Sequence, residues 1–231
     1  MLRKWDKLPE DMRVPEVRPY YDILNKKRFS IFLKRVTDYI LAILFLLLTI
    51  IPMGIIAIAI RLDSKGPAMY RQERVTTYGK HFMIHKFRTM MVNADQIGTS
   101  VTVNADQRVT RIGKKLRHFR LDELPQVFDV LAGNMSFVGT RPEVVKYVEQ
   151  YPPEFRATLL LPAGITSEAS IRYKNEYKLL DRADDVDKTY MEKVLPEKMA
   201  WNLKSITRFR FLREILTMLR TVAAMLGVEF Y

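Results

Sequence analysis

Two adjacent carboxylates, Asp122 and Glu123, stand in the stretch FRLDELPQ of a strongly basic chain. Neighbouring residues of a helix project about 100° apart, so these acids cannot face each other across a substrate as the carboxylates of a glycosidase do. An acid at the start of a helix commonly caps it and is stabilised by its positive end. A carboxylate can also attack phosphorus directly and form an aspartyl phosphate. The surrounding residues decide between a structural role and this chemistry.

Basic residues are dense around the pair. The candidate phosphate-binding residues lie near the end of a predicted strand, just before the pair, and in the later stretch GTRPE; they are Lys86, Arg88, Arg117 and Arg141. Further cations of the same region are Arg108, Arg111, Lys114, Lys115 and Arg120. Taken singly, each is typical of solvated surface charge. Together with the pair they predict a site for a diphosphate, with Mg²⁺ bridging its oxygens to Asp122 and Glu123.

The composition restricts the classes of partner and of chemistry. The chain has 231 residues, 38 Lys or Arg against 26 Asp or Glu, and a formal charge of +12. Such an excess predicts an anionic partner, which is nucleic acid, an anionic lipid surface or a phosphorylated substrate. The absence of cysteine excludes disulfides, thiolate catalysis and Cys-based zinc sites. Three scattered histidines do not indicate a histidine-based metal centre.

One apolar segment predicts a membrane protein. Residues 39–60, YILAILFLLLTIIPMGIIAIAI, contain no charge over 22 residues. At about 1.5 Å per residue they are long enough to cross a hydrocarbon core of roughly 30 Å. Ten Lys or Arg precede the segment, so it does not resemble a secretory signal peptide.

The same segment can span the bilayer or return to its starting side. Pro52 lies near its middle, where it removes a helical hydrogen bond and favours a kink. Both flanks are rich in Lys and Arg, which favour the cytoplasmic side of a membrane. A helix that bends at Pro52 and returns keeps both flanks on that side. We therefore favour a re-entrant hairpin over a single span.

The rest of the chain divides into segments of different pattern. Four regions are predicted: a basic, irregular arm on the membrane over 1–28, the re-entrant helix over 29–62, a cytoplasmic catalytic domain over 63–204, and an amphipathic membrane-interface helix with the C-terminus over 205–231. A helix packed on a core is the alternative reading of the last region. Within the catalytic region we expect a β-hairpin over 68–90, helices over 89–96, 110–119, 122–131 and 144–151, a polar loop over 99–107 and a turn-rich loop over 136–143.

Two alternative functions remain open from the residues alone. Asp185 and Asp187 form an Asp-X-Asp pattern that conventional nucleotide-sugar glycosyltransferases use for metal binding, but the chain lacks alternating βα units and a glycine-rich phosphate loop. A non-catalytic, basic, membrane-attached binding protein is the other alternative. Nucleic acid is not expected as a partner, because no recognisable nucleic-acid module occurs.

Seven motifs follow one another between about Lys34 and Leu219: KRVTDYILAILFLLLTIIP, HKFRTM, TRIGKKLR, LDELPQVFDVLAGNMSFVGTRPE, PAGIT, DKTYMEKV and NLKS. Together they resemble the bacterial sugar transferases called monotopic phosphoglycosyl transferases. The resemblance implies an α+β, mainly helical fold with a re-entrant membrane helix broken at Pro52, a small β-hairpin, and amphipathic helices along the membrane surface. The implied location is the cytoplasmic face of the bacterial inner membrane.

The resemblance also implies an activity. The family transfers a sugar 1-phosphate from a nucleotide diphosphate sugar, here expected to be a UDP-sugar, to a polyprenyl phosphate such as undecaprenyl phosphate. The reaction is ping-pong, requires Mg²⁺, releases a nucleoside monophosphate, and is the first membrane step of glycoconjugate assembly. An oligomer is compatible with the family.

The resemblance assigns roles to single residues. Asp122 is the expected nucleophile that forms a covalent phosphosugar intermediate, and Glu123 its acid/base and metal-binding neighbour. Lys86, Arg88 and Arg141 match positions around the phosphates, and Asp187 matches the acid of a D-x-x-Y motif. The sequence departs from the family pattern at Thr140, where proline is usual, and at Ser167-Glu168-Ala169-Ser170, where a glycine-tryptophan-alanine run is usual.

Overall fold

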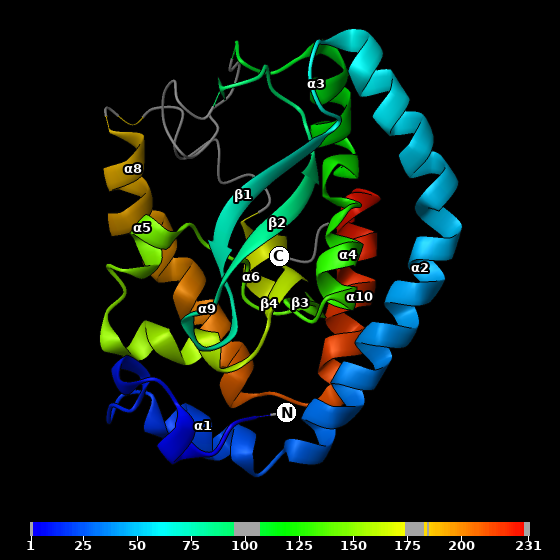
Figure 1. Cartoon of the computed structure of the whole chain (residues 1–231). Helices are drawn as coiled ribbons and strands as arrows, with labels where there is room; N and C mark the ends of the chain where they lie inside the picture. The colour runs from blue at the N-terminus through cyan, green and yellow to red at the C-terminus, as the bar shows by residue number, and fades with distance from the viewer. Residues whose placement is uncertain (1, 95–106, 174–182, 184, 229–231) are drawn as a thin grey trace.

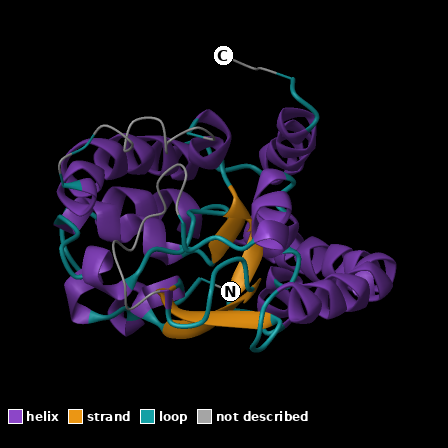
Figure 2. Cartoon of the chain, turned by 90° about the horizontal axis from the view of Figure 1, so that it is seen from above, coloured by secondary structure: helices purple, strands orange, loops and turns teal. Residues whose placement is uncertain are grey.

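The computed structural model of the chain describes residues 2–94, 107–173, 183 and 185–228. Its helices form two groups with short strands between them, and one long helix curves along an edge (Figures 1 and 2). The strands pair as two separate two-stranded sheets. This arrangement confirms a mainly helical α+β fold with a small β-hairpin.

The predicted apolar segment lies in helix α2 (Arg28–Asp63), which by length and composition could cross a membrane. Pro52 lies inside it and cannot donate to the carbonyl of Leu48. Thr49 Oγ1 donates to the Phe45 carbonyl at 2.7 Å, a bond that favours bending. The helix continues through the proline along one curved path (Figure 1). The hairpin break at Pro52 therefore stays a prediction.

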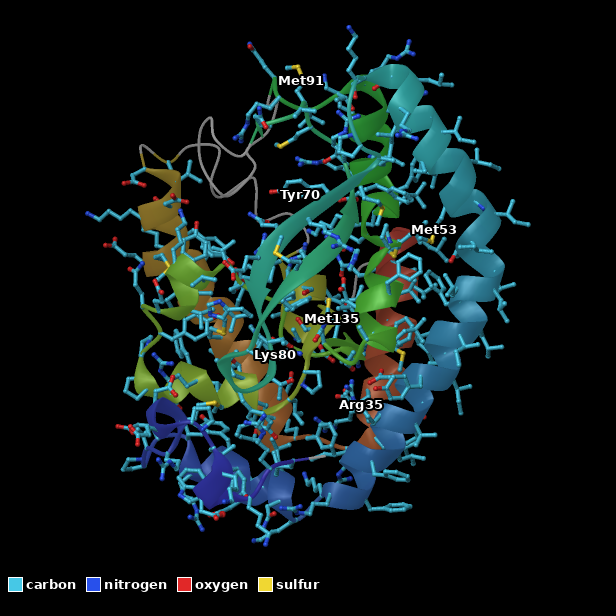
Figure 3. All side chains as sticks on the ribbon, in the orientation of Figure 1. Arg35, Met53, Tyr70, Lys80, Met91 and Met135 are labelled. Atoms are coloured by element: carbon cyan, nitrogen blue, oxygen red, sulfur yellow. The ribbon has the colours of Figure 1, made fainter. Side chains whose placement is uncertain are left out.

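Both ends of α2 bind the same folded domain. Near the N-terminal end, Arg35 donates from Nη1 to the Met135 carbonyl at 3.1 Å and from Nη2 to the Gly133 carbonyl at 2.8 Å. Arg35 accordingly lies between α2 and the rest of the domain in Figure 3. At the C-terminal end, Asp63 Oδ2 accepts from the Ile112 N–H at 3.0 Å.

The predicted β-hairpin is confirmed. Strands β1 (Met69–Val75) and β2 (His81–Phe87) are antiparallel and joined by the turn η3 (Thr77–Gly79). The hairpin is fixed to the helix after the acidic pair, because the buried Asp129 carboxylate accepts from the His85 N–H at 2.9 Å and contacts His85 Nδ1 at 2.8 Å. This contact sets the position of the next residue on β2, which is a predicted phosphate-binding lysine.

The acidic pair lies between two helices. Helix α3 (Arg111–His118) confirms the helix predicted over 110–119 and is capped by the Thr110 side chain, and α4 (Gln126–Leu131) follows the pair. The pair itself occupies a 3-10 turn, η5 (Leu121–Glu123). Of the helix predicted over 122–131, the part from Gln126 to Leu131 is confirmed as α4, whereas its start is wrong, because Pro125 lacks an N–H and separates α4 from the turn of the acidic pair.

The segment before α3 differs from its prediction. In place of the short helix over 89–96, Met90 pairs with Val109 in an isolated antiparallel bridge. Residues 95 and 96, and nearly all of the polar loop predicted over 99–107, lie outside the described residues.

A second sheet was not predicted. Strands β3 (Met135–Val138) and β4 (Ala163–Thr166) are parallel. The backbone after β3 and the backbone of β4 are in close contact at Gly139 and Gly164. A Cβ atom added to Gly164 would lie only 2.1 Å from the Gly139 nitrogen. The turn-rich loop predicted over 136–143 is therefore wrong in its first part, because residues 136–138 belong to β3. The small residue that follows allows two backbone segments to approach closely and does not mark a turn.

Residues 2–28 are not irregular. They contain the short turns η1 (Trp5–Lys7) and η2 (Glu10–Met12) and helix α1 (Arg18–Asn25). Their buried side chains join the largest core cluster; these are Leu2, Leu8, Met12, Val17, Tyr21 and Leu24. The prediction of an irregular arm is wrong in this respect, because unevenly spaced apolar residues give no helical or strand period and still reach a core.

The C-terminal amphipathic segment consists of two helices. Helix α9 (Leu195–Thr207) lies in the core and α10 (Phe211–Met225) lies beside α2 (Figure 1). The continuous helix predicted from residue 205 is interrupted because Phe209 is buried and its carbonyl accepts from Lys27 Nζ at 2.7 Å. The shorter elements between the strands and α9 are α5 (Val145–Val148), η6 (Pro153–Leu160), α6 (Glu168–Arg172), α8 (Val186–Thr189) and the π-helical turn η7 (Tyr190–Val194).

Candidate active site

Glu123 is the centre of a cluster of cations. Arg141 Nη2 donates to Glu123 Oε1 at 2.5 Å, and Lys86 Nζ lies 3.6 Å from the same oxygen. Arg120 Nη1 lies 3.9 Å from Oε2. Burial raises the pKa of Glu123, but the charges of Arg141 and Lys86 outweigh burial and hold the pKa well below its usual range. Glu123 is therefore ionised at neutral pH.

Asp122 is in the opposite situation. Within the described ranges of the chain, its carboxylate makes no hydrogen bond or ion pair. Burial and the negative charge of Glu123 raise the pKa of Asp122. The cations around the pair lower it by a smaller amount, so the pKa stays above its usual value. A carboxylate of raised pKa whose oxygens are not occupied by another group is, in its ionised form, suited to nucleophilic attack.

Lys86 is the cation whose charge is most sensitive to pH. Its side chain is 18% exposed, and it lies near the Glu123 carboxylate and within reach of the charge of Arg141. Burial, aided by the charge of Arg141, lowers the pKa of Lys86 to about 8 against the attraction of Glu123. The ammonium form that binds phosphate is thus lost just above neutral pH.

The loop after β3 holds Arg141 in place. Arg74 Nη1 donates to the Pro142 carbonyl at 3.2 Å. The buried Glu143 accepts from the Tyr190 hydroxyl at 2.7 Å. Two residues that directly follow Arg141 are therefore fixed to β1 and to the segment after α8.

Asp187 lies in the network behind this loop. Its carboxylate accepts from the Tyr147 hydroxyl at 2.6 Å and from Lys146 Nζ at 2.7 Å, and the ring of Tyr147 is 5.1 Å from that of Tyr190. In the part of the chain that the structure describes, no hydrogen bond or ion pair joins Asp187 to the acidic pair. Asp185 caps the start of α8, so both acids of the Asp-X-Asp pattern already have structural partners.

The other two predicted arginines are placed differently. Arg88 donates from Nη1 to the Lys65 carbonyl at 2.7 Å and from Nη2 to the Ser64 carbonyl at 2.8 Å, which ties it to the end of α2. Arg117 Nε donates to Thr89 Oγ1 at 2.8 Å, and its charge acts on the acidic pair. The structure thus brings Arg117 to the site and turns Arg88 toward the C-terminal end of α2.

The carboxylate pair fits Mg²⁺ by its chemistry. Magnesium is commonly bound by one or two carboxylates together with phosphate oxygens of a substrate. Asp122 has its oxygens available, and Glu123 has lone pairs beyond those that Arg141 uses. No group of three or more acidic or histidine side chains converges among the described residues. This donor set fits a metal held jointly with a phosphorylated substrate.

Two further arginines belong to the site: Arg120, which the sequence places in the cation cluster without a named role, and Arg74, which the sequence does not indicate. Arg120 has a left-handed backbone with φ 55° and ψ 22°, which directs the chain into the turn of the acidic pair. Its place directly before LDEL was a usable signal. Arg74 supports the Arg141 loop from 68 residues away, and nothing in the local sequence indicates that contact.

Comparisons with known proteins agree with this site. The family model described as bacterial sugar transferase matches residues 29–227. The chain is 34% identical over 199 residues to a UDP-glucose:undecaprenyl-phosphate glucose-1-phosphate transferase of Caulobacter vibrioides, covering 85% of this chain and 70% of that protein. It is 39% identical over 180 residues to the Escherichia coli protein of the same name, covering 76% of this chain and 38% of that protein.

A third relative is also matched over only part of its length. The UDP-N-acetylgalactosamine-undecaprenyl-phosphate N-acetylgalactosaminephosphotransferase of Aeromonas hydrophila is 43% identical over 123 residues, covering 53% of this chain and 29% of that protein. The chain therefore spans about a third of the length of two of these three relatives. The family match nevertheless extends over most of this chain and includes the acidic pair and its cations. The chain belongs to the bacterial sugar transferase family.

Proposed function

We propose that the chain is a phosphoglycosyl transferase that moves a sugar 1-phosphate from a UDP-sugar to undecaprenyl phosphate. The names of its relatives specify UDP-sugars and undecaprenyl phosphate, which supports this pair of substrates. The observation that carries the proposal is the contrast within the pair. Within the part of the chain that the structure describes, the Asp122 carboxylate has no hydrogen-bond or ion-pair partner, whereas cations hold Glu123.

In the first half of the reaction, an Asp122 oxygen attacks the phosphorus that carries the sugar. The bond from this phosphorus to the bridging oxygen breaks, UMP leaves, and an aspartyl phosphosugar forms. Lys86 and Arg141 bind the diphosphate oxygens and stabilise the charge that develops on them. Mg²⁺, when bound by the carboxylate pair, neutralises further phosphate charge.

In the second half, a phosphate oxygen of undecaprenyl phosphate attacks the same phosphorus. The bond to Asp122 breaks, and the carboxylate is regenerated. Glu123 lies beside this phosphorus and assists the incoming phosphate, while its charge keeps Lys86 and Arg141 in place for both halves.

The test of this mechanism is the variant Asp122→Asn. We expect UMP release from UDP-sugar and undecaprenyl phosphate to fall to background, because an amide is not a nucleophile for phosphorus, while membrane association is retained. With UDP-sugar alone, the unmodified chain should gain the mass of one sugar phosphate and the variant none. The exposed Glu192→Gln serves as the matched control. Near-normal turnover by Asp122→Asn, or release of UDP in place of UMP, would contradict the proposal.

We also propose that α2 enters the cytoplasmic face of the bacterial inner membrane and leaves by the same face, with its break at Pro52. Both ends of α2 bind one domain: Lys34 Nζ donates to the Val138 carbonyl at 2.7 Å near one end, and Asp63 binds the N-terminus of α3 at the other. A hydrocarbon core of about 30 Å cannot separate two ends that bind one domain. The outward side chains of α2, such as Leu48 at 78% exposure, suit contact with lipid.

The absence of cysteine makes this topology testable. Single cysteines in place of the exposed Lys26 and Lys65 mark the two sides of α2. We expect a membrane-impermeant maleimide to label both in inverted membrane vesicles and neither in right-side-out vesicles. Opposite labelling of the two positions would establish a single span.

A further inference from the structure

A cavity of about 370 Å³ lies between β3, α6, α9 and α10. This volume falls within the range of about 300–1,000 Å³ that is usual for small-molecule sites. Its lining contains Gly139 and Thr140 of the loop after β3 but not Asp122, Glu123 or Arg141. The cavity is thus distinct from the carboxylate pair, and the proposed transfer reaction gives it no role.

Cations predominate on the cavity walls. They are Arg172, Lys204, Arg208, Arg213 and Arg220. Among the residues that the structure describes, Lys204, Arg208 and Arg213 make no ion pair, and all three are exposed. A concave surface lined by cations that no acid neutralises attracts an anion.

The acids of the walls do not cancel this charge. Glu214 binds Lys34 at 2.6 Å, and Glu168 binds Arg220 at 3.0 Å. The cavity also offers a neutral donor, because among the described residues the buried Asn202 uses its Nδ2 only in a weak contact of 3.8 Å with Met199 Sδ. Arginines with a neighbouring amide are suitable donors for the oxygens of a phosphate.

One edge of the cavity is apolar and exposed. Leu216 of α10 lines it and is 45% exposed. Leu212 and Leu219 lie one turn before and after on the same helical face, at 76% and 63% exposure. A free phosphate or nucleotide would leave these leucines in water. An anion with hydrocarbon chains would cover them, with its phosphate among the arginines.

We propose that this cavity binds the phosphate headgroup of an anionic membrane phospholipid, whose chains lie along the apolar side of α10. The proposal rests on the membrane location in the proposed function but not on its transfer chemistry. A resident phospholipid is favoured over undecaprenyl phosphate, because the phosphate of the acceptor has to reach Asp122 and Asp122 does not line the cavity. The bound lipid would fix the orientation of α9 and α10 at the membrane surface.

The fluorescence of Trp201, which lines the cavity, provides the test. The chain has two tryptophans, so the full chain carrying Trp5→Phe reports on Trp201 alone. Delipidated protein in neutral detergent is titrated with phosphatidylglycerol. We expect a saturable change in emission, an at least tenfold weaker affinity for Arg208→Gln/Arg213→Gln, and little response to phosphatidylcholine. Arg210→Gln is the matched control, because it removes an exposed cation between the two that does not line the cavity, and its affinity should stay within about twofold.

Three outcomes would overturn the proposal. Equal weakening by Arg210→Gln would indicate general surface charge. An equal response to inorganic phosphate would remove the lipid chains from the interaction. Saturation by undecaprenyl phosphate but not by phosphatidylglycerol would make the cavity an acceptor site. UMP release by the same variants in detergent is measured in parallel, so a failure of the transfer reaction is distinguished from a failure of lipid binding.

Discussion

At the scale of residues, two neighbouring carboxylates have opposite surroundings. Arg141 and Lys86 hold Glu123 in an ionised, fixed state, whereas Asp122 keeps its oxygens available and has a raised pKa. The sequence predicted the pair and most of its cations because they lie in dense, recognisable motifs. The phosphate-binding role of Arg88 stays a prediction, because its guanidinium binds the carbonyls of Ser64 and Lys65 in this structure. The strand ends at Phe87, and the guanidinium of Arg88 is free to turn to the end of α2.

The pKa of Lys86 leads to a prediction about pH. Below about 8 the ammonium form is present and binds phosphate, and above it the charge is lost. We therefore expect kcat/KM for the UDP-sugar to fall as the pH rises through about 8. Lys86→Arg should move this fall to higher pH, because a guanidinium stays protonated there. UMP release measured across neutral and alkaline pH checks this, and an unchanged profile in Lys86→Arg would assign the titration to another group.

At the scale of elements, long sequence patterns predicted secondary structure more reliably than short segments predicted strand pairing. The long uncharged run of residues 39–60 correctly predicted a helix. The strand-like stretches on either side of a glycine-containing turn correctly predicted the β1–β2 hairpin. Strands β3 and β4 have four residues each, and their parallel pairing is set by the close contact of Gly139 with Gly164. No local sequence pattern predicts a contact between two glycines that are so far apart in the sequence. The same holds for α1, whose apolar residues find their core only in the folded chain.

Lys34 of α2 binds one residue of β3 and one of α10, and these contacts lead to a prediction about stability. It is 4% exposed, and its Nζ binds the Val138 carbonyl at 2.7 Å and Glu214 at 2.6 Å, with Asp38 at 4.0 Å. Lys34→Met leaves two acids without their cation and should lower the free energy of unfolding by about 3–5 kcal/mol. Thermal unfolding in detergent measures this. The exposed Lys26→Met should change little, and Lys34→Met/Glu214→Gln should recover part of the loss; a single variant as stable as the parent would contradict the role of Lys34.

At the scale of the whole molecule, two surface properties meet in one chain. The formal charge of +12 favours anionic lipid, and the exposed apolar residues of α2 favour the hydrocarbon core. The second effect should dominate anchoring, because surface charge is screened by salt and apolar burial is not.

We therefore expect the chain to remain in the membrane fraction after a wash with about 1 M salt, where the Debye length is only about 3 Å. Sedimentation of washed membranes measures the retained fraction. A variant with Leu48→Glu and Ile51→Glu should be released in larger part, because charge within the hydrocarbon layer is costly. Release of the parent chain by salt alone would mean that its basic surface is the main anchor.

The re-entrant path proposed for α2, whose two ends bind one domain, would have a mechanical consequence for the membrane. A segment that enters and leaves by the same face adds its volume to one leaflet and leaves the other unchanged. The occupied leaflet gains area relative to its partner, and a bilayer relieves such a difference by curving toward the occupied side. Each copy of the chain would then act as a small wedge, concentrated where the membrane is already convex toward the cytoplasm and depleted where it is concave.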